Sequence, residues 1–325
     1  MASRAAEVKL RRGGVAPLAL GWGLVVASFV LLGVAISQVL NVQFGTTPSN
    51  QGTVLLLTAL GVVLGVFGIG RIADRTRGLT PALVTFVFSL LAVEALLRAY
   101  AVPPGLIPTP SRVWTALVNG LEVLARDAAV TFVQEALVGY LGGTIVAILV
   151  ALAVVRFRFL ERGLLPYAAV ASSVPIVALA PVIVKAFGLE PVSKAIIVGI
   201  TVFFPIVVNV VRGLQSANPH HLDLMRTYAV PPARTFLLVR VPSALPFLFT
   251  ALKIATTLAM IGAIVGEFFG ATGEGLGFRI QIEAGRFNLD VVWAAIVVAS
   301  VLGIAFYGLV SWLESRFTFR FGSAK

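Results

Sequence analysis

Long apolar stretches, separated by short polar segments, set the pattern of the whole chain. A helix needs about 20 apolar residues to cross the hydrocarbon core of a membrane. Backbone groups in lipid must be hydrogen-bonded internally, so stretches this long form helices rather than barrel strands. The pattern therefore predicts an all-α fold, a polytopic transmembrane helical bundle of about eight spans. The eight candidate spans are 15–40, 53–70, 80–100, 128–154, 163–187, 191–212, 246–268 and 291–313.

The predicted bundle divides near residue 78. Residues 1–78 hold two very apolar helices joined by a short charge-free loop, whereas Pro, Gly and polar residues interrupt the spans of 79–325. The first apolar stretch is longer than the core of a signal peptide, so we expect it to remain as a span. We therefore expect two extra N-terminal helices followed by a separate transmembrane core.

Composition excludes a water-soluble protein of this size. Hydrophobic residues make up 58% of the 325 residues and charged residues 12%, against about 25% charged residues in a typical soluble domain. The net charge is +11, but the basic residues flank the apolar stretches, as membrane insertion requires, and do not indicate nucleic-acid binding.

The distribution of Lys and Arg predicts the orientation. With the N-terminus in the cytoplasm, 18 of the 25 Lys and Arg residues fall on the inner side and 7 on the outer side. Cytoplasmic loops carry this excess in membrane proteins. We therefore expect a multi-pass protein of the plasma (inner) membrane with both termini in the cytoplasm.

Residues for catalysis or metal binding are scarce. The chain has no cysteine, its two histidines are adjacent, and no Gly-Lys dipeptide is present, which excludes thiolate metal sites and a phosphate-binding loop of the nucleotide-hydrolase type. Ser172 and Ser173 have no candidate base nearby in the sequence. We expect that this chain is not an enzyme and that it binds no metal and no cofactor. Energy for transport must then come from an ion gradient or from another subunit.

The longest polar interruption between spans is the loop 213–245. Asn218 and Pro219 suit the start of a short helix, and Pro231-Pro232 suits its end. A second short helix is expected over 233–241, before Pro242 turns the chain back into the membrane. Two short helices at an angle on the inner face form an element that a partner protein can grip.

The loop resembles the signature loop of the permease subunits of ABC importers, the inner-membrane components of binding-protein-dependent transport systems. In that pattern, Asp223 stands at the Glu position, Ala229 at the Gly position and Val241-Pro242 at the Leu-Pro position, so the spacing agrees throughout. The missing Gly removes the residue best suited to a sharp turn between the two loop helices.

Other segments are similar to the nitrate/sulfonate/taurine branch of that family, which includes relatives of pyrimidine-precursor, thiamine and riboflavin type. The likeness extends over about residues 80–320 and leaves out the first two spans. The similar segments are Leu106–Trp114, Val174–Pro181, Phe203–Asn209, and Glu267 followed by Gly275–Gly277.

The resemblance implies a six-helix permease core with a separate cytoplasmic ATP-binding cassette ATPase, which binds the ATP. It also implies an extracytoplasmic substrate-binding protein and a second permease copy, in a homodimer or with a related partner. The residues implied in coupling to the ATPase are Asp223, Arg226, Thr227, Ala229, Arg234 and Pro242.

Buried ionisable groups and helix-breaking prolines are candidates for the solute path or its gate. Glu267 ranks first, and its alternative is an interfacial carboxylate paired with Arg279 or Arg286. Asp223 and Arg226 can also simply pair on one helix face, as can Glu94 and Arg98. Lys185 and Lys194 are expected to extend toward the membrane surface. The path or gate candidates are Glu267, Asn209, Pro175, Pro181 and Glu135.

The function that follows is the import of a small solute by alternating access, with ATP hydrolysis in a partner subunit. The alternative is a secondary transporter driven by an ion gradient through carboxylates such as Glu135. The sequence leaves the solute and the role of the two N-terminal helices open.

Overall fold

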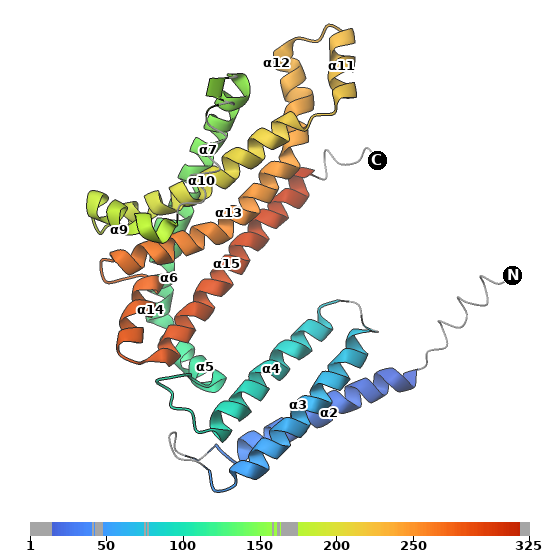
Figure 1. Ribbon diagram of the computed structural model, residues 1–325, viewed down its shortest axis with the longest axis vertical. Coiled ribbons are helices and arrows are strands. Elements are labelled where there is room, and N and C mark those ends of the chain that lie inside the picture. The colour runs from blue at the N-terminus through green and yellow to red at the C-terminus, as the bar shows by residue number, and fades with distance from the viewer. Residues whose placement is uncertain are drawn as a thin grey trace, which may run out of the picture. The chain divides into compact units, whose positions relative to one another are not determined.

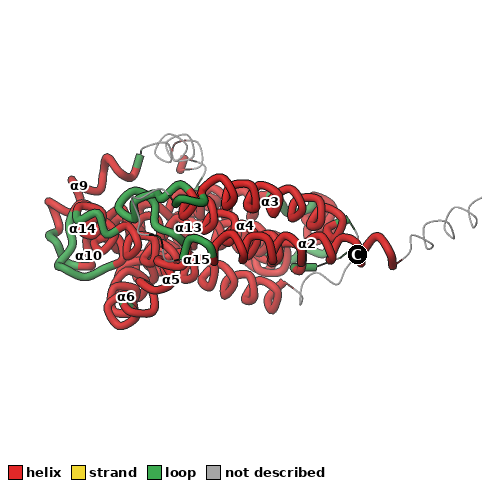
Figure 2. The backbone as a smooth tube through the Cα atoms, turned by 90° about the horizontal axis from the view of Figure 1, so that it is seen from below, coloured by secondary structure: helices red, strands yellow, loops and turns green. Residues whose placement is uncertain are grey.

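The structure, a computed structural model, describes residues 15–40, 42, 48–74, 76, 78–157, 159–160, 163 and 175–318. Throughout these residues the chain is helical, with loops and turns between the helices and no strand (Figure 2). The predicted all-α membrane bundle is therefore confirmed.

The chain forms two compact units, residues 1–119 with 286–293 and residues 120–285 with 294–325. The helices of the first unit are α2 (Val15–Ser37), α3 (Gln51–Ala73), α4 (Thr80–Ala99) and α5 (Pro110–Asn119). The second unit begins with α6 (Leu121–Ala129), the π-helix η1 (Val130–Leu137), α7 (Val138–Arg156), α9 (Ile176–Phe187) and α10 (Pro191–Gln215). It continues with α11 (Pro219–Thr227), α12 (Pro232–Thr235), the π-helix η2 (Phe236–Arg240), α13 (Val241–Phe269) and α14 (Leu276–Gly285), and α15 (Leu289–Thr318) starts in the first unit and ends in the second (Figure 1).

Seven helices in the described part of the chain are long and apolar enough to cross a membrane. They coincide with seven of the eight predicted spans. In the remaining prediction, 163–187, residues 164–174 lie outside those that the structure describes. Its described part contains α9, which has 12 residues.

The first unit packs through small residues. Ser28 Oγ of α2 donates a hydrogen bond to the Gly61 carbonyl of α3 at 2.7 Å, and Gly65 faces Ser28 and Phe88 with no room for a side chain. Because glycines let helix backbones approach closely, α2 and α3 gain packing contacts that lipid-exposed surfaces lack. At the end of α4 the predicted ion pair is confirmed, with Arg98 Nε 2.5 Å from Glu94 Oε1.

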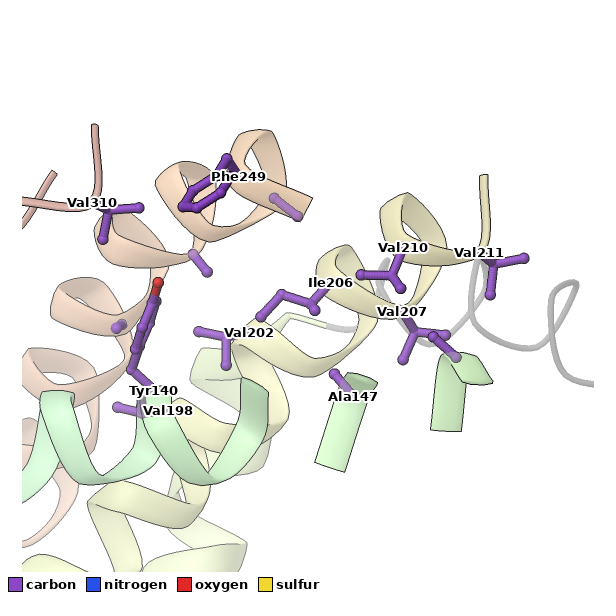
Figure 3. Packing of buried hydrophobic residues seen from close by; sticks show 14 of the residues in the cluster. Tyr140, Ala147, Val198, Val202, Ile206, Val207, Val210, Val211, Phe249 and Val310 are labelled. Atoms are coloured by element: carbon purple, nitrogen blue, oxygen red, sulfur yellow. The ribbon is translucent and has the colours of Figure 1, made fainter. Parts of the chain in front are cut away.

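The second unit is built around α10. Its buried valines and isoleucine lie against α7 and α13, and Figure 3 shows Val202 and Ile206 between these neighbours. Gly143 of α7 faces the Gly199 carbonyl of α10, where an added Cβ would lie 2.6 Å from the oxygen. The apolar residues of the spans therefore form one continuous core that fixes α7, α10 and α13 against each other.

Two spans are longer than the membrane requires. Residues Leu121–Arg156 and Pro232–Phe269 each form one run, of 36 and 38 residues, which at 1.5 Å per residue is about 54 and 57 Å. Each run contains one π-helical segment, a distortion that often lies at functional sites.

The second short helix of the polar loop was expected to end before Pro242, and that prediction is wrong. Pro242 lies inside the continuous run Pro232–Phe269, at the start of α13. A proline ring clashes with the carbonyl four residues earlier in a regular α-helix. The wider π-helical turn of η2 directly precedes Pro242 and gives the ring room, so the helix continues.

The predicted boundary near residue 78, which rests on the change in composition of the spans, stays a prediction. In the structure α4, which that boundary assigns to the permease core, packs with α2 and α3 in the first unit.

Candidate functional site

A column of three buried polar residues runs along one face of the helix that passes through α6 and η1. Asp127, Thr131 and Glu135 follow one another at intervals of four residues, which keeps them on the same side of a helix. Their exposed fractions are 1%, 0% and 1%. Burying polar groups in a membrane span is costly unless they are paired, so the partners of this column define the candidate site.

The main partner is Glu267, near the end of α13. Its Oε1 accepts a hydrogen bond from Thr131 Oγ1 at 2.5 Å, and its carboxyl group interacts electrostatically with that of Glu135. Its Oε2 accepts the backbone N–H groups of Gly277 and Phe278. Glu267 therefore joins the buried column to the first turn of α14.

Asp127, Thr131 and Glu267 all accept hydrogen bonds from the backbone at the start of α14. Gly275 N donates to Asp127 Oδ1 at 3.0 Å and Leu276 N donates to Thr131 Oγ1 at 2.8 Å. The first N–H groups of a helix have no partner within the helix, and here carboxylates and a hydroxyl supply the missing acceptors. The negative charge also suits the positive end of the helix dipole.

Two glycines make room for the Glu267 carboxyl group. Gly275 has φ +121°, and a Cβ there would lie 2.5 Å from Glu267 Cδ. A Cβ on Gly277 would lie 2.6 Å from the Ile264 carbonyl oxygen. The Gly-Leu-Gly segment therefore passes directly over the carboxyl group because neither glycine carries a side chain.

Lys194 of α10 places a positive charge beside this site. Its exposed fraction is 1%, it interacts electrostatically with Glu135 and Glu267, and its Nζ donates to the carbonyls of Leu189 and Glu190. The stem is buried, and the amino group reaches back to loop carbonyls that precede α10; that it extends toward the membrane surface stays a prediction. The absence of a side chain at Gly266, where a Cβ would lie 2.9 Å from Lys194 Cγ, lets the lysine stem enter the interior.

Arg279 does not pair with Glu267 as the alternative interpretation expected. Its Nε donates to Asp127 Oδ2 at 2.8 Å, and its Nη1 lies 3.9 Å from Glu283 Oε1. The site thus contains the carboxyl groups of Asp127, Glu135 and Glu267 with cationic groups on two sides. One carboxyl oxygen, Glu135 Oε2, is buried with no hydrogen-bond partner among the described residues.

The other path candidates lie elsewhere. Asn209 is half-buried on α10 and donates to the Pro205 carbonyl at 2.7 Å. It stands fifteen residues after Lys194, about 22 Å along the helix. Pro175 caps α9 and Pro181 lies within it, both exposed. Of the predicted path residues, the structure brings together Glu135 and Glu267 alone.

The predicted coupling loop forms a second candidate site at the opposite end of α13 from α14. Asn218 caps α11 by accepting the His220 N–H at 2.9 Å, as expected, and Asp223 pairs with Arg226 at 3.1 Å. Thr227 Oγ1 donates to the Asp223 carbonyl at 3.0 Å. Arg234 is exposed on α12.

Ala229 provides the turn between α11 and α12. Its φ is +49°, in the left-handed region that favours glycine. Ala229 N donates to the Arg226 carbonyl and Val230 N to the Met225 carbonyl, both at 2.9 Å, which is the hydrogen-bond pattern of a Schellman motif. The turn that the family pattern builds with Gly is therefore present with Ala in its place.

The loop also exposes large apolar side chains. The exposed fraction of Leu224 is 51%, of Tyr228 74%, and of Leu237 64%. Apolar side chains gathered on a polar loop indicate a surface that a protein partner covers.

Sequence reasoning did not single out Asp127 or Thr131, and it did not connect Lys194 with Glu135 and Glu267. The only signal in the sequence was the interval of four residues from Asp127 to Thr131 to Glu135, which places polar groups on one face of an apolar helix.

Comparison with known proteins adds an independent line of evidence. Residues 143–319 match the family model described as the binding-protein-dependent transport system inner membrane component. A probable ABC transporter permease protein of Haemophilus influenzae is 31% identical over 246 residues, 75% of this chain and 98% of that protein.

Two further relatives carry more specific names. The formylaminopyrimidine transport permease protein of Halalkalibacterium halodurans is 31% identical, with 74% of this chain and 94% of that protein covered. The riboflavin transport system permease protein of Chloroflexus aurantiacus is 30% identical, with 76% and 94% covered. The aligned part of this chain thus corresponds to nearly the whole length of each relative.

Proposed function

The chain belongs to the family of inner-membrane components of binding-protein-dependent transport systems, and from this we propose that it is the transmembrane subunit of an ATP-driven importer. It is an ABC importer permease with multiple spans in the inner membrane. In the proposed cycle it moves a small solute into the cytoplasm by alternating access, and a partner subunit binds and hydrolyses the ATP.

The coupling loop is the observation that carries this proposal. It combines the exposed ion pair of Asp223 and Arg226 with exposed Leu224 and Tyr228 on a short capped helix. We assign this surface, with Thr227, Ala229, Arg234 and Pro242, to a cytoplasmic ATP-binding cassette ATPase. An extracytoplasmic binding protein delivers the solute, and a second permease copy completes the path.

The site around Glu267 is assigned to the gate. Glu267 and Thr131 hold the start of α14 to the long helices, so a movement of α13 that separates these groups releases α14. The Glu267 interactions lie at one end of α13 and the coupling loop lies at the other end. A movement of α13 can therefore connect ATPase binding at one membrane face with the gate at the other. Asn209, Pro175 and Pro181 are further candidates along the path.

Co-purification tests the ATPase assignment. The Asp223→Ala/Arg226→Ala chain is expected to lose the ATPase that purifies with the unaltered chain. The Glu122→Ala/Arg126→Ala chain, which removes an equally exposed ion pair on α6, is the matched control and should retain it. Normal binding by the Asp223→Ala/Arg226→Ala chain would show that this part of the loop is not the docking surface.

The second candidate function is an ion-driven secondary transporter, which the buried Glu135 Oε2 favours, since it has no hydrogen-bond partner in the described part of the chain. The two functions differ in their energy source. Uptake that stops on ATP depletion and persists with a protonophore supports the importer, and the reverse result supports the secondary transporter.

The solute is proposed at the level of its class. The family branch suggests a nitrate, sulfonate or taurine type or a vitamin-precursor type, and two relatives carry formylaminopyrimidine and riboflavin in their names. Calorimetry on the substrate-binding protein that works with this chain would identify the solute. Both termini are placed in the cytoplasm, and a reporter fused within 213–245 that proved active on the external face would contradict this.

A further inference from the structure

A groove runs between α13 and α15. One part of about 660 Å³ is lined mainly by apolar side chains, among them Met260, Ile264 and Ile304. A second part of about 430 Å³ includes Thr250 and Lys253. Thr257 and Tyr307 line both parts, so the groove is continuous.

Polar residues follow this groove through the membrane span. On α13 they are Thr250, Lys253 and Thr257, at intervals of three and four residues. On α15, Ser300 and Tyr307 are seven residues apart, and Glu314 follows after another seven. Both intervals keep residues on one face of a helix, so each helix presents one polar stripe.

Thr250 Oγ1 and Ser300 Oγ each donate a hydrogen bond to a carbonyl of their own helix, so the charged residues of the stripe decide what it faces. Lys253 Nζ lies 2.6 Å from Glu314 Oε2, and their side chains are 21% and 24% exposed. Charged residues within spans are rare and face a bundle interior or a water-filled cavity. The Lys253–Glu314 pair therefore favours an aqueous path along the α13–α15 groove over a lipid-facing surface.

The chemistry of the groove selects the kind of solute. Lys253 is the cation that lines it, and Glu314 neutralises that charge. An anion entering the groove would lose water without gaining an unpaired positive partner, which is costly at low dielectric. The hydroxyl groups of Thr257 and Tyr307 have no hydrogen-bond partner among the described residues, so they can bind polar atoms of a solute. The apolar side chains that line the rest of the groove suit a flat ring.

We propose that the groove between α13 and α15 is this chain's share of the solute path, and that it admits uncharged, hydrogen-bonding ring compounds in preference to small inorganic or sulfonate anions. This inference rests on the proposed import function and specifies its solute class.

Cysteine labelling tests the path, because the chain has no cysteine of its own. Ser300→Cys is a near-isosteric change in the groove, and Thr257→Cys is a second one on α13. Val301→Cys is the control, since Val301 is at the same depth and 59% exposed but about 100° further round the helix. The probe is the neutral reagent 2-hydroxyethyl methanethiosulfonate, applied to the full chain in membrane vesicles.

Reaction at Ser300→Cys and Thr257→Cys, with Val301→Cys unreactive, is the expected result. If all three are unreactive, the groove faces lipid and the path assignment fails. If Ser300→Cys instead gives disulfide-linked dimers and does not react, a second copy fills the groove and the assignment also fails. None of these readings requires the ATPase, so the labelling and the co-purification can fail independently.

The solute class is tested by charge. Relative to their rates with a simple thiol in solution, the anionic sulfonatoethyl reagent should react severalfold more slowly than the neutral reagent at Thr257→Cys. Adding Glu314→Gln, which leaves Lys253 unpaired, should raise the anionic rate, and Lys253→Met/Glu314→Gln should lower it again. Equal rates for the two reagents, or no effect of Glu314→Gln, would overturn the preference for uncharged solutes.

Discussion

Thr131 Oγ1 donates a hydrogen bond to Glu267 Oε1 at 2.5 Å, across 136 residues of sequence. The same hydroxyl oxygen accepts the N–H of Leu276. One side chain thus links the helix through η1, the end of α13 and the start of α14, and all three elements depend on it.

We expect Thr131→Val to destabilise the chain. Valine keeps the shape of the side chain but leaves the buried Leu276 N–H without its acceptor, which costs about 1–3 kcal/mol. The thermal unfolding midpoint in detergent should fall. Thr85→Val, which removes an exposed hydroxyl bonded only within its own helix, should change it little. Equal shifts for both variants would show that the Thr131 contacts contribute nothing of their own.

Gly277→Ala should destabilise the fold more than the small volume of one added methyl group suggests. The new methyl group would lie 2.6 Å from the Ile264 carbonyl oxygen and 2.7 Å from Glu267 Oε2, and overpacking of this kind costs about 1–3 kcal/mol. Gly285→Ala on the same helix meets nothing within 4 Å and is the control. Expression level and unfolding midpoint measure the difference, and a Gly277→Ala chain as stable as the control would contradict the close packing.

Lys194→Met should be strongly destabilising, because it removes the positive charge beside Glu135 and Glu267. Removing one member of a buried ionic group costs about 3–5 kcal/mol. The double variant Lys194→Met/Glu135→Gln also removes a carboxyl group that interacts with Lys194 and should recover part of the loss. If the double variant is no more stable than the single one, Lys194 acts through packing alone.

Ala229→Gly should stabilise the coupling loop. Ala229 is held at φ +49°, and a residue with a Cβ in this region costs about 1–2 kcal/mol relative to glycine. The unfolding midpoint should rise slightly, and protection of the Val230 N–H from exchange should increase. Ala125→Gly, in the regular helix α6, should lower the unfolding midpoint instead, since glycine within a helix costs about 1 kcal/mol of stability. A loss of stability in both variants would mean that the left-handed turn carries no strain.

The spans and the local contacts could be predicted from the sequence because each depends on a short stretch of chain. Apolar length alone located seven spans that the structure confirms. The cap at Asn218 and the pairs Asp223–Arg226 and Glu94–Arg98 follow from intervals of two to four residues on one helix.

The buried site could not be predicted in the same way, because its partners come from three separate helices. Nothing near Lys194 in the sequence indicates that its stem is buried, since the space for the stem is provided by Gly266 on another helix. Glu267 was identified through family likeness, but its actual partners, Thr131 and the start of α14, depend on how the helices pack. The continuation of the helix through Pro242 depends on a π-helical turn, and the composition of the segment does not predict that turn.

The unbroken run from Pro232 to Phe269 also sets a scale for movement. Over its 38 residues, about 57 Å at 1.5 Å per residue, a tilt of about 5° pivoting at one end displaces the other by about 5 Å. A lever arm of this length turns a small rotation on one side of the bilayer into a shift as large as a full helical turn on the other.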